Sequence, residues 1–162
     1  MKLLKNTARL FLALAVGAAP FAALSAEDKK MDDSALMEPV KSVLDHYLEI
    51  QSDLAKDSLK GVDEHANAIA KAVKGDEMKM LPPDIAKQAD TLAQAKDLKA
   101  AREAFKPLSA SLVKYLAENK AGQGTYHEAY CPMAKANWLQ TGKAIKNPYM
   151  GKAMLTCGEL KN

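Results

Sequence analysis

Four stripes of apolar residues, repeating every three or four positions, are the feature that most constrains how this chain can fold. Such spacing places apolar side chains on one face of an α-helix. The stripes comprise Leu36, Val40, Val43, Leu44, Tyr47 and Leu48; Leu59, Val62, Ala66, Ile69, Ala70 and Val73; Ile85, Ala89, Leu92 and Ala93; and Leu98, Ala101, Phe105, Leu108, Leu112, Val113 and Leu116.

The residues that flank the stripes are typical of helix ends. Pro39 suits a first helical turn, where its missing N–H costs nothing. Asp57-Ser58 and Asp97 are expected N-caps, and Pro82-Pro83-Asp84 is expected to begin the third helix. Pro107 lies inside the fourth stripe and should kink or split that helix. Four amphipathic segments with short connections predict an all-α fold, an antiparallel up-down four-helix bundle.

The N-terminus has the pattern of a secretory signal peptide. Lys2, Lys5 and Arg9 precede an apolar run from Leu10 to Leu24, which ends at small residues before Glu27. The run is short for a membrane span. We therefore expect a signal peptide over 1–26, a flexible leader over 27–35 and a single helical-bundle domain over 36–162.

Removing the signal peptide changes the charge balance. The full chain has 23 basic and 20 acidic residues, and residues 1–26 carry three of the basic ones and no acidic one. The mature chain is therefore neutral, which argues against nucleic acid and against an anionic membrane surface as partners. No second apolar stretch is long enough to span a bilayer. We expect an exported, periplasmic protein with no span after signal cleavage.

The residues after Asn119 differ in character. The helical stripe ends, and Ala121-Gly122-Gln123-Gly124 reads as a flexible break. We expect an irregular C-terminal segment, with a motif over 125–159, that packs on the bundle. It holds both cysteines, the only tryptophan, three of the five tyrosines and three of the eight methionines.

Two thiols and three thioethers lie within about thirty residues of this segment, and such soft donors select Cu(I) and, by the same logic, Ag(I). We take Cys131 and Cys157 as anionic ligands and Met133 and Met154 as thioether ligands of a predicted site. Met150 and His127 are reserve ligands. If the stretch from Met150 to Cys157 is helical, its three sulfur residues share one face. Asn147-Pro148 and Gly151 provide a turn that could fold this group back on Cys131.

A structural interpretation uses the same residues. Two cysteines in an exported protein are first of all candidates for a disulfide. The methionines would then be core residues, and Trp138 would be a hydrophobic plug that ties the segment to the bundle.

Other chemistries lack their motifs. The chain has no Cys-x-x-Cys, no Cys-x-x-Cys-His for covalent haem and no glycine-rich phosphate loop. Two cysteines with one nearby histidine fall short of a zinc site. Cys131 and His127 have no evident orienting group for nucleophilic catalysis. We therefore expect neither an enzyme, nor haem, nor a bound nucleotide.

The C-terminal segment resembles a known family. The strings Tyr130-Cys131-Pro132-Met133-Ala134, Asn147-Pro148-Tyr149 and Met154-Leu155-Thr156-Cys157-Gly158, with Trp138 and Gly151 between them, are similar to an exported bacterial domain of unknown function. That domain occurs alone after a signal peptide, and at the C-terminal end of periplasmic adaptor subunits of copper and silver efflux systems. The motif positions carried onto this chain are Cys131, Met133, Trp138, Asn147, Pro148, Tyr149, Gly151, Met154 and Cys157.

The resemblance implies a periplasmic location and heavy-metal handling. The first functional hypothesis is a Cu(I)- or Ag(I)-binding protein that buffers metal or delivers it to an efflux system, with the adaptor as partner. The alternative is a module without metal, in which a Cys131–Cys157 disulfide locks the segment and the protein docks to an envelope or efflux partner.

Overall fold

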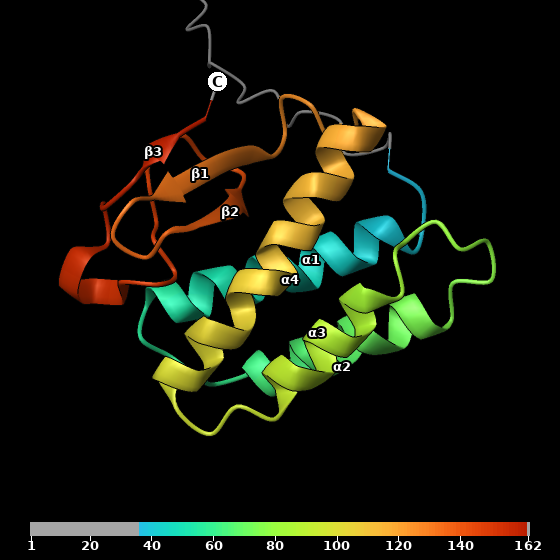
Figure 1. Ribbon diagram of the computed structural model, residues 1–162, viewed down its shortest axis with the longest axis horizontal. Helices are drawn as coiled ribbons and strands as arrows, with labels where there is room; N and C mark the ends of the chain where they lie inside the picture. Colours follow the sequence, from blue (N-terminus) through green and yellow to red (C-terminus); the bar gives the residue numbers. More distant parts are fainter. Residues whose placement is uncertain (1–35, 162) are drawn as a thin grey trace, which may run out of the picture. The chain divides into compact units, whose positions relative to one another are not determined.

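The computed structural model describes residues 36–161, so the expected signal peptide and leader lie outside the described residues. Four α-helices come first in the chain, and three short strands and a 3-10 helix follow (Figure 1). The elements are α1 (Val40–Ala55), α2 (Val62–Lys74), α3 (Asp84–Ala93), α4 (Leu98–Asn119), β1 (His127–Cys131), β2 (Ala136–Gln140), η2 (Gly151–Met154) and β3 (Glu159–Leu160).

All four expected helices are present, and two of their predicted starts are confirmed. Helix α3 begins at Asp84, directly after the two prolines, and Asp97 caps α4 by accepting a hydrogen bond from the Ala100 N–H at 2.8 Å. Helix α4 runs unbroken through Pro107, so the proline does not split it. Within residues 36–161 no helix is both long and apolar enough to cross a membrane.

The predicted N-cap of α2 is wrong. The helix begins at Val62, after Gly61 in a left-handed conformation with φ of 84°, and not after Asp57-Ser58. The carboxylate of Asp57 instead bonds to Arg102 of α4. A capping residue satisfies only one backbone N–H, whereas a guanidinium offers a charge-assisted bond, so the tertiary partner prevails over the local one.

The prediction of an all-α class with an irregular C-terminal segment holds only in part. The described fold is mostly helical, but this segment contains an antiparallel three-stranded sheet of order β2-β1-β3. Cys131 pairs with Ala136 across a turn over 132–135, and Tyr130 pairs with Glu159 on the other side. Ladder hydrogen bonds let backbone polar groups lie against an apolar core, which an irregular segment could not do without loss.

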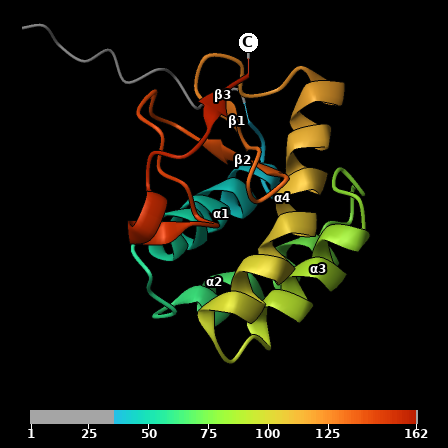
Figure 2. The ribbon, with the colours of Figure 1, turned by 60° about the vertical axis from the view of Figure 1, so that its left-hand side comes forward.

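The sheet and the helix pair α2–α3 lie on opposite sides of α1 in both views (Figures 1 and 2). Consecutive helices pack against each other, and strand β2 contacts both α1 and α4. Helix α4 crosses α1 steeply in both views. The last helix and the first therefore present a common surface to the hairpin formed by β1 and β2.

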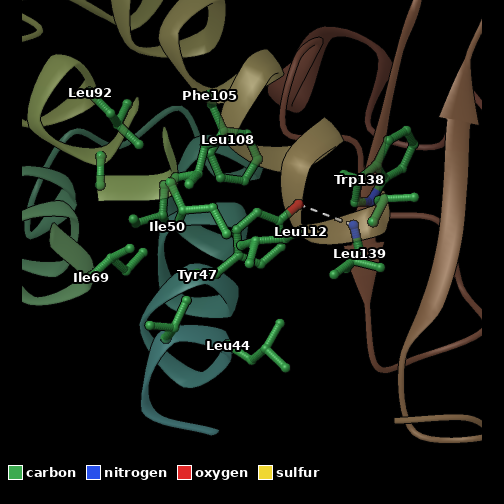
Figure 3. Close-up of a cluster of buried hydrophobic side chains, with 14 of the residues drawn as sticks. Leu44, Tyr47, Ile50, Ile69, Leu92, Phe105, Leu108, Leu112, Trp138 and Leu139 are labelled. Atoms are coloured by element: carbon green, nitrogen blue, oxygen red, sulfur yellow. Dashed lines mark hydrogen bonds between the residues drawn. The ribbon is translucent and has the colours of Figure 1, made fainter. Parts of the chain in front are cut away.

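One hydrophobic core joins helices and sheet (Figure 3). Tyr47, Phe105 and Trp138 are its largest fully buried side chains. The Tyr47 ring stacks on Phe105, and its hydroxyl lies 2.6 Å from Ser109 Oγ and accepts a 3.1 Å hydrogen bond from the Leu139 N–H. Burial raises the pKa of Tyr47, so this hydroxyl stays neutral. It ties α1, α4 and β2 together.

Candidate functional site

The two cysteines meet where β1 ends. Cys131 is the last residue of β1 and is buried, and Cys157 lies half-buried just before β3. Their sulfurs are 3.2 Å apart and both are free thiols. The Ala134 N–H also points to Cys131 Sγ at 3.4 Å. After the expected turn at Asn147 the chain does bring Cys157 back to Cys131.

The two thiols differ in acidity. Burial raises the pKa of Cys131, but hydrogen bonds from the Ala134 N–H, from Cys157 and from Asn147 together outweigh it and lower that pKa. The pKa of Cys157 is raised, chiefly because its thiol donates to Cys131 and then because of burial. When one proton leaves the pair, the charge therefore resides on Cys131 and the proton on Cys157. A thiolate is the form that attacks electrophiles and binds metals.

Asn147 organises the loop that carries Cys157. Its side chain is fully buried, and its Oδ1 accepts hydrogen bonds from the N–H groups of Tyr149 at 2.8 Å and Met150 at 3.0 Å. Its Nδ2 donates to the Cys157 carbonyl oxygen. An asparagine that closes a turn on its own backbone is a common local device. Here the same amide also fixes the backbone of a candidate ligand.

The 3-10 helix η2 is anchored to the helices by an ion pair. Arg102 of α4 donates from Nη2 to Asp57 Oδ1 and, at 3.0 Å, to the Leu54 carbonyl, and from Nε to the Pro148 carbonyl at 2.9 Å. The hydrogen bond from Arg102 lowers the pKa of Asp57. A Cβ on Gly151, whose φ is 55°, would overlap both Asp57 Oδ1 and Arg102 Nη2. Glycine is therefore required at this position for two independent reasons.

Two aromatic residues of the motif, Trp138 and Tyr149, are buried in the core and contact each other. Tyr149 is buried, contacts Trp138 edge-on with ring centroids 5.9 Å apart, and donates from its hydroxyl to the Asn137 carbonyl. Trp138 Nε1 donates to Gln140 Oε1 at 3.1 Å. A Cβ on Gly158 would lie 2.9 Å from the Trp138 ring. Trp138 therefore is the hydrophobic plug that its sequence position indicated.

Two of the three methionines of the segment lie at the surface. Met133, in the turn after β1, is 61% exposed, and Met154, at the end of η2, is 40% exposed. Met133 and Met150 line one groove of about 480 Å³ against α4, next to Lys99 and Lys106. Because η2 ends at Met154, the stretch from Met150 to Cys157 has no continuous α-helical face. Exposed thioethers are free to turn toward an ion, whereas core methionines are not.

His127 is placed away from the cysteines. It begins β1, four residues before Cys131. A strand rises by ~3.3 Å per residue, so the two Cα atoms are about 13 Å apart. Within residues 36–161 no group of three or more His, Cys, Asp or Glu side chains could hold a metal ion. Methionine sulfur lies outside that donor set, so a soft-metal site would depend on the two cysteines and their neighbouring thioethers.

The ion pair between Asp57 and Arg102 was not predicted from the sequence, although one signal pointed to it. Arg102 is the only arginine after the expected signal peptide, in a chain that otherwise uses lysine. Arginine is favoured where a planar group must bind several acceptors at once, and Arg102 binds three. A lone arginine among lysines was thus a sign of a specific tertiary contact.

Fold and site together define a helical domain that carries a cysteine-containing hairpin. The family of proteins of unknown function DUF3347 matches residues 43–124, and the chain belongs to this family. The match covers the four helices from Val43 onward and ends at Gly124, before β1. No curated protein and no solved structure matches the chain. The cysteine motif therefore lies outside the part of the chain by which the family is recognised.

Proposed function

We propose that this protein binds Cu(I) or Ag(I) at Cys131 and Cys157. The observation that carries the proposal is the pair of free thiols 3.2 Å apart, with the pKa of one lowered. Thiolates select soft monovalent ions, and a low pKa reduces competition from protons at neutral pH.

The separation of the sulfurs suits a metal after a small adjustment. If the metal–sulfur bonds have the ~2.3 Å length and the tetrahedral angle of a zinc–thiolate site, two thiolate ligands lie about 3.8 Å apart. The pair must therefore open by roughly 0.6 Å. Cys157 can supply this movement because it is half-buried in the short stretch between η2 and β3.

The thioether ligands in this proposal are Met133 and Met154. Met133 follows Cys131 by two residues, and the Cys157 N–H donates to the Met154 carbonyl at 3.0 Å. Each cysteine thus has an exposed methionine within three residues. Met150 remains a reserve ligand because it shares a groove with Met133. His127 is the weakest candidate, given its distance along β1.

The cellular role that we propose is periplasmic buffering of the metal or its delivery to an efflux system. Two features of the sequence support this role: the signal-peptide pattern over 1–26, and the resemblance of the C-terminal motif to domains of periplasmic efflux adaptors. An adaptor of that kind is the proposed partner. Thioether ligands that are exposed at the surface fit a protein that passes its metal on.

An anaerobic competition titration tests the proposal. The reduced protein, without residues 1–26, competes for Cu(I) with a chromophoric chelator. We expect one equivalent to be bound, and binding to be lost in a Cys131→Ser/Cys157→Ser variant. Met133→Leu should weaken binding, whereas Met78→Leu, at a methionine that is also exposed but lies in the loop between α2 and α3, should not. Failure to compete, or equal small losses from every variant, would overturn the proposal.

The second candidate is a module without metal that docks to an envelope partner. The same juxtaposition favours it, because a disulfide would need the two sulfurs to approach to ~2.05 Å, a movement of about 1.2 Å. Protein isolated from the periplasm separates the two. Two alkylatable thiols favour the metal site, and a disulfide that resists mild reductant favours the docking module.

A further inference from the structure

Two histidines outside the cysteine site face each other across α1 and α2. His46 Nδ1 lies 3.0 Å from His65 Nδ1, and the ring centroids are 5.2 Å apart. Both side chains are half-buried. They are presented by rigid elements, since α1 and α2 pack directly on each other. Two of the three histidines of this chain therefore converge through the same ring atom.

The distance between the two nitrogens has a chemical meaning. With metal–nitrogen bonds of ~2.0–2.1 Å, nitrogens 3.0 Å apart subtend an angle of about 94° at a shared ion. A tetrahedral ion would need them ~3.3 Å apart. A right angle is the preference of Cu(II) and Ni(II), whose sites are square-planar or tetragonal.

Two carboxylate residues share the face of α1 that carries His46. Glu49 and Asp53 follow His46 by three and seven residues, so they lie on the same face of α1. A Cβ on Gly61 would lie 3.6 Å from His65 Nε2 and 3.9 Å from Asp53 Oδ2, which places this carboxylate on the Nε2 side of the ring. A negative field favours a cation here, and a carboxylate behind a ligating histidine is a common supporting feature.

We propose that His46 and His65 form an open two-imidazole site for a divalent transition metal, and that Cu(II) is the ion bound most tightly. Cu(II) comes first because affinity for nitrogen sites peaks at this ion. Within the described residues no third His, Cys, Asp or Glu completes a cluster, so water fills the remaining positions. An open site of this kind exchanges its ion readily. This site is independent of the proposed Cu(I) site.

Binding requires a tautomer change and a rotation of the two rings, because the Nδ1 atoms of the hydrogen-bonded pair point at each other and both must turn toward the ion. In the metal-free pair, one Nδ1–H donates to the lone pair of the other Nδ1. When the ion takes both Nδ1 lone pairs, that proton moves to Nε2 of the same ring. No electron is transferred, and no proton is released.

A Cu(II) titration followed by electron paramagnetic resonance tests this proposal. The protein carries Cys131→Ser/Cys157→Ser, so that thiols neither bind nor reduce the ion, and it has no affinity tag. We expect one equivalent with an axial spectrum and hyperfine splitting from two nitrogens. His46→Ala or His65→Ala should weaken binding by about tenfold or more, since even loss of an outer-shell partner costs 10–100-fold. His127→Ala is the matched control and should bind as the parent does.

A second variant guards against a loss that reflects unfolding. In His46→Asn the amide replaces Nδ1 as a hydrogen-bond partner for His65 but is a poor ligand for Cu(II). We expect native circular dichroism with binding as weak as in His46→Ala. Undiminished binding in the His46 and His65 variants, or an equal loss in His127→Ala, would overturn the proposal.

Discussion

At the scale of the residue, the acidity of the cysteine pair is the property closest to function. Cys131 is buried, yet its pKa is lowered, because hydrogen bonds from its neighbours, chiefly the Ala134 N–H and the Cys157 thiol, outweigh the effect of burial. In the singly deprotonated pair, the Cys131 thiolate accepts a hydrogen bond from the Cys157 thiol, which keeps its proton. Both thiols must therefore be treated as one titrating unit.

The pair gives a prediction with a definite sign. Cys157→Ala removes a donor to the Cys131 thiolate, so the pKa of Cys131 should rise toward its ordinary value. Cys131→Ala removes the partner that raises the pKa of Cys157, so the pKa of Cys157 should fall. Thiolate absorbance of the reduced variants, followed over pH, measures both. If the remaining thiol had the same pKa in both single variants, and this pKa equalled the first pKa of the parent protein, the hydrogen bond between the two thiols would be contradicted.

Tyr47 is the residue on which the join between helices and sheet depends. Tyr47→Phe keeps the ring but leaves Ser109 and the Leu139 N–H without their partner. We expect the free energy of unfolding to fall by ~1–3 kcal/mol, the usual cost of a buried polar group without a hydrogen bond. Denaturant unfolding measures this loss. Tyr130→Phe, on the half-buried side of β1, is the control and should change stability by less than ~0.5 kcal/mol.

At the scale of the element, the helices were predictable and the sheet was not. Helix α4 is predicted by an apolar stripe of seven residues and by the N-cap Asp97, and both signals are local in the sequence. Strands β1 and β2 have five residues each and β3 has two, too short for an alternating pattern to stand out. Their pairing depends on contacts with α1 and α4, which no local pattern contains.

The residues of the candidate site likewise fall into those that the sequence predicts and those that it does not. Its motif residues, from Cys131 through Asn147 to Cys157, were found because rare side chains gather in one stretch of sequence. Asp57 lies some ninety residues before η2, and nothing local links it to Gly151. Its position on a loop even imitates a helix cap. Long-range ion pairs of this kind become visible only in the folded chain.

Gly151 tests whether η2 is held as described. Gly151→Ala introduces a Cβ that overlaps the Asp57–Arg102 pair, at a backbone conformation that costs ~1–2 kcal/mol for a residue other than glycine. We expect a loss of roughly 2 kcal/mol or more in the free energy of unfolding. Gly142→Ala is a matched control, because its Cβ would meet nothing within 4 Å. Equal effects at the two glycines would contradict the proposed anchoring of η2.

At the scale of the whole described chain, the hairpin and its following loop depend on the helices for their position. Trp138 and Tyr149 belong to the same core as the helical residues, and Arg102 reaches from α4 to the loop. Only Cys131 and Cys157 are placed to link β1 to the loop covalently. The redox state of these two cysteines should therefore change the free energy of unfolding.

Oxidation of the pair provides the corresponding prediction. A Cys131–Cys157 disulfide would close a loop of 26 residues, which in the chain-entropy treatment adds about 3.5 kcal/mol to the free energy of unfolding. Unfolding with and without reductant measures the difference, and Cys131→Ser/Cys157→Ser should abolish it. A gain of this size would show that the sulfurs can reach bonding distance without disturbing the hydrogen bonds of the Asn147 side chain. No gain, or a loss, would mean that the hydrogen bonds of Asn147 resist formation of the disulfide. The two thiols would then stay available as thiolate ligands.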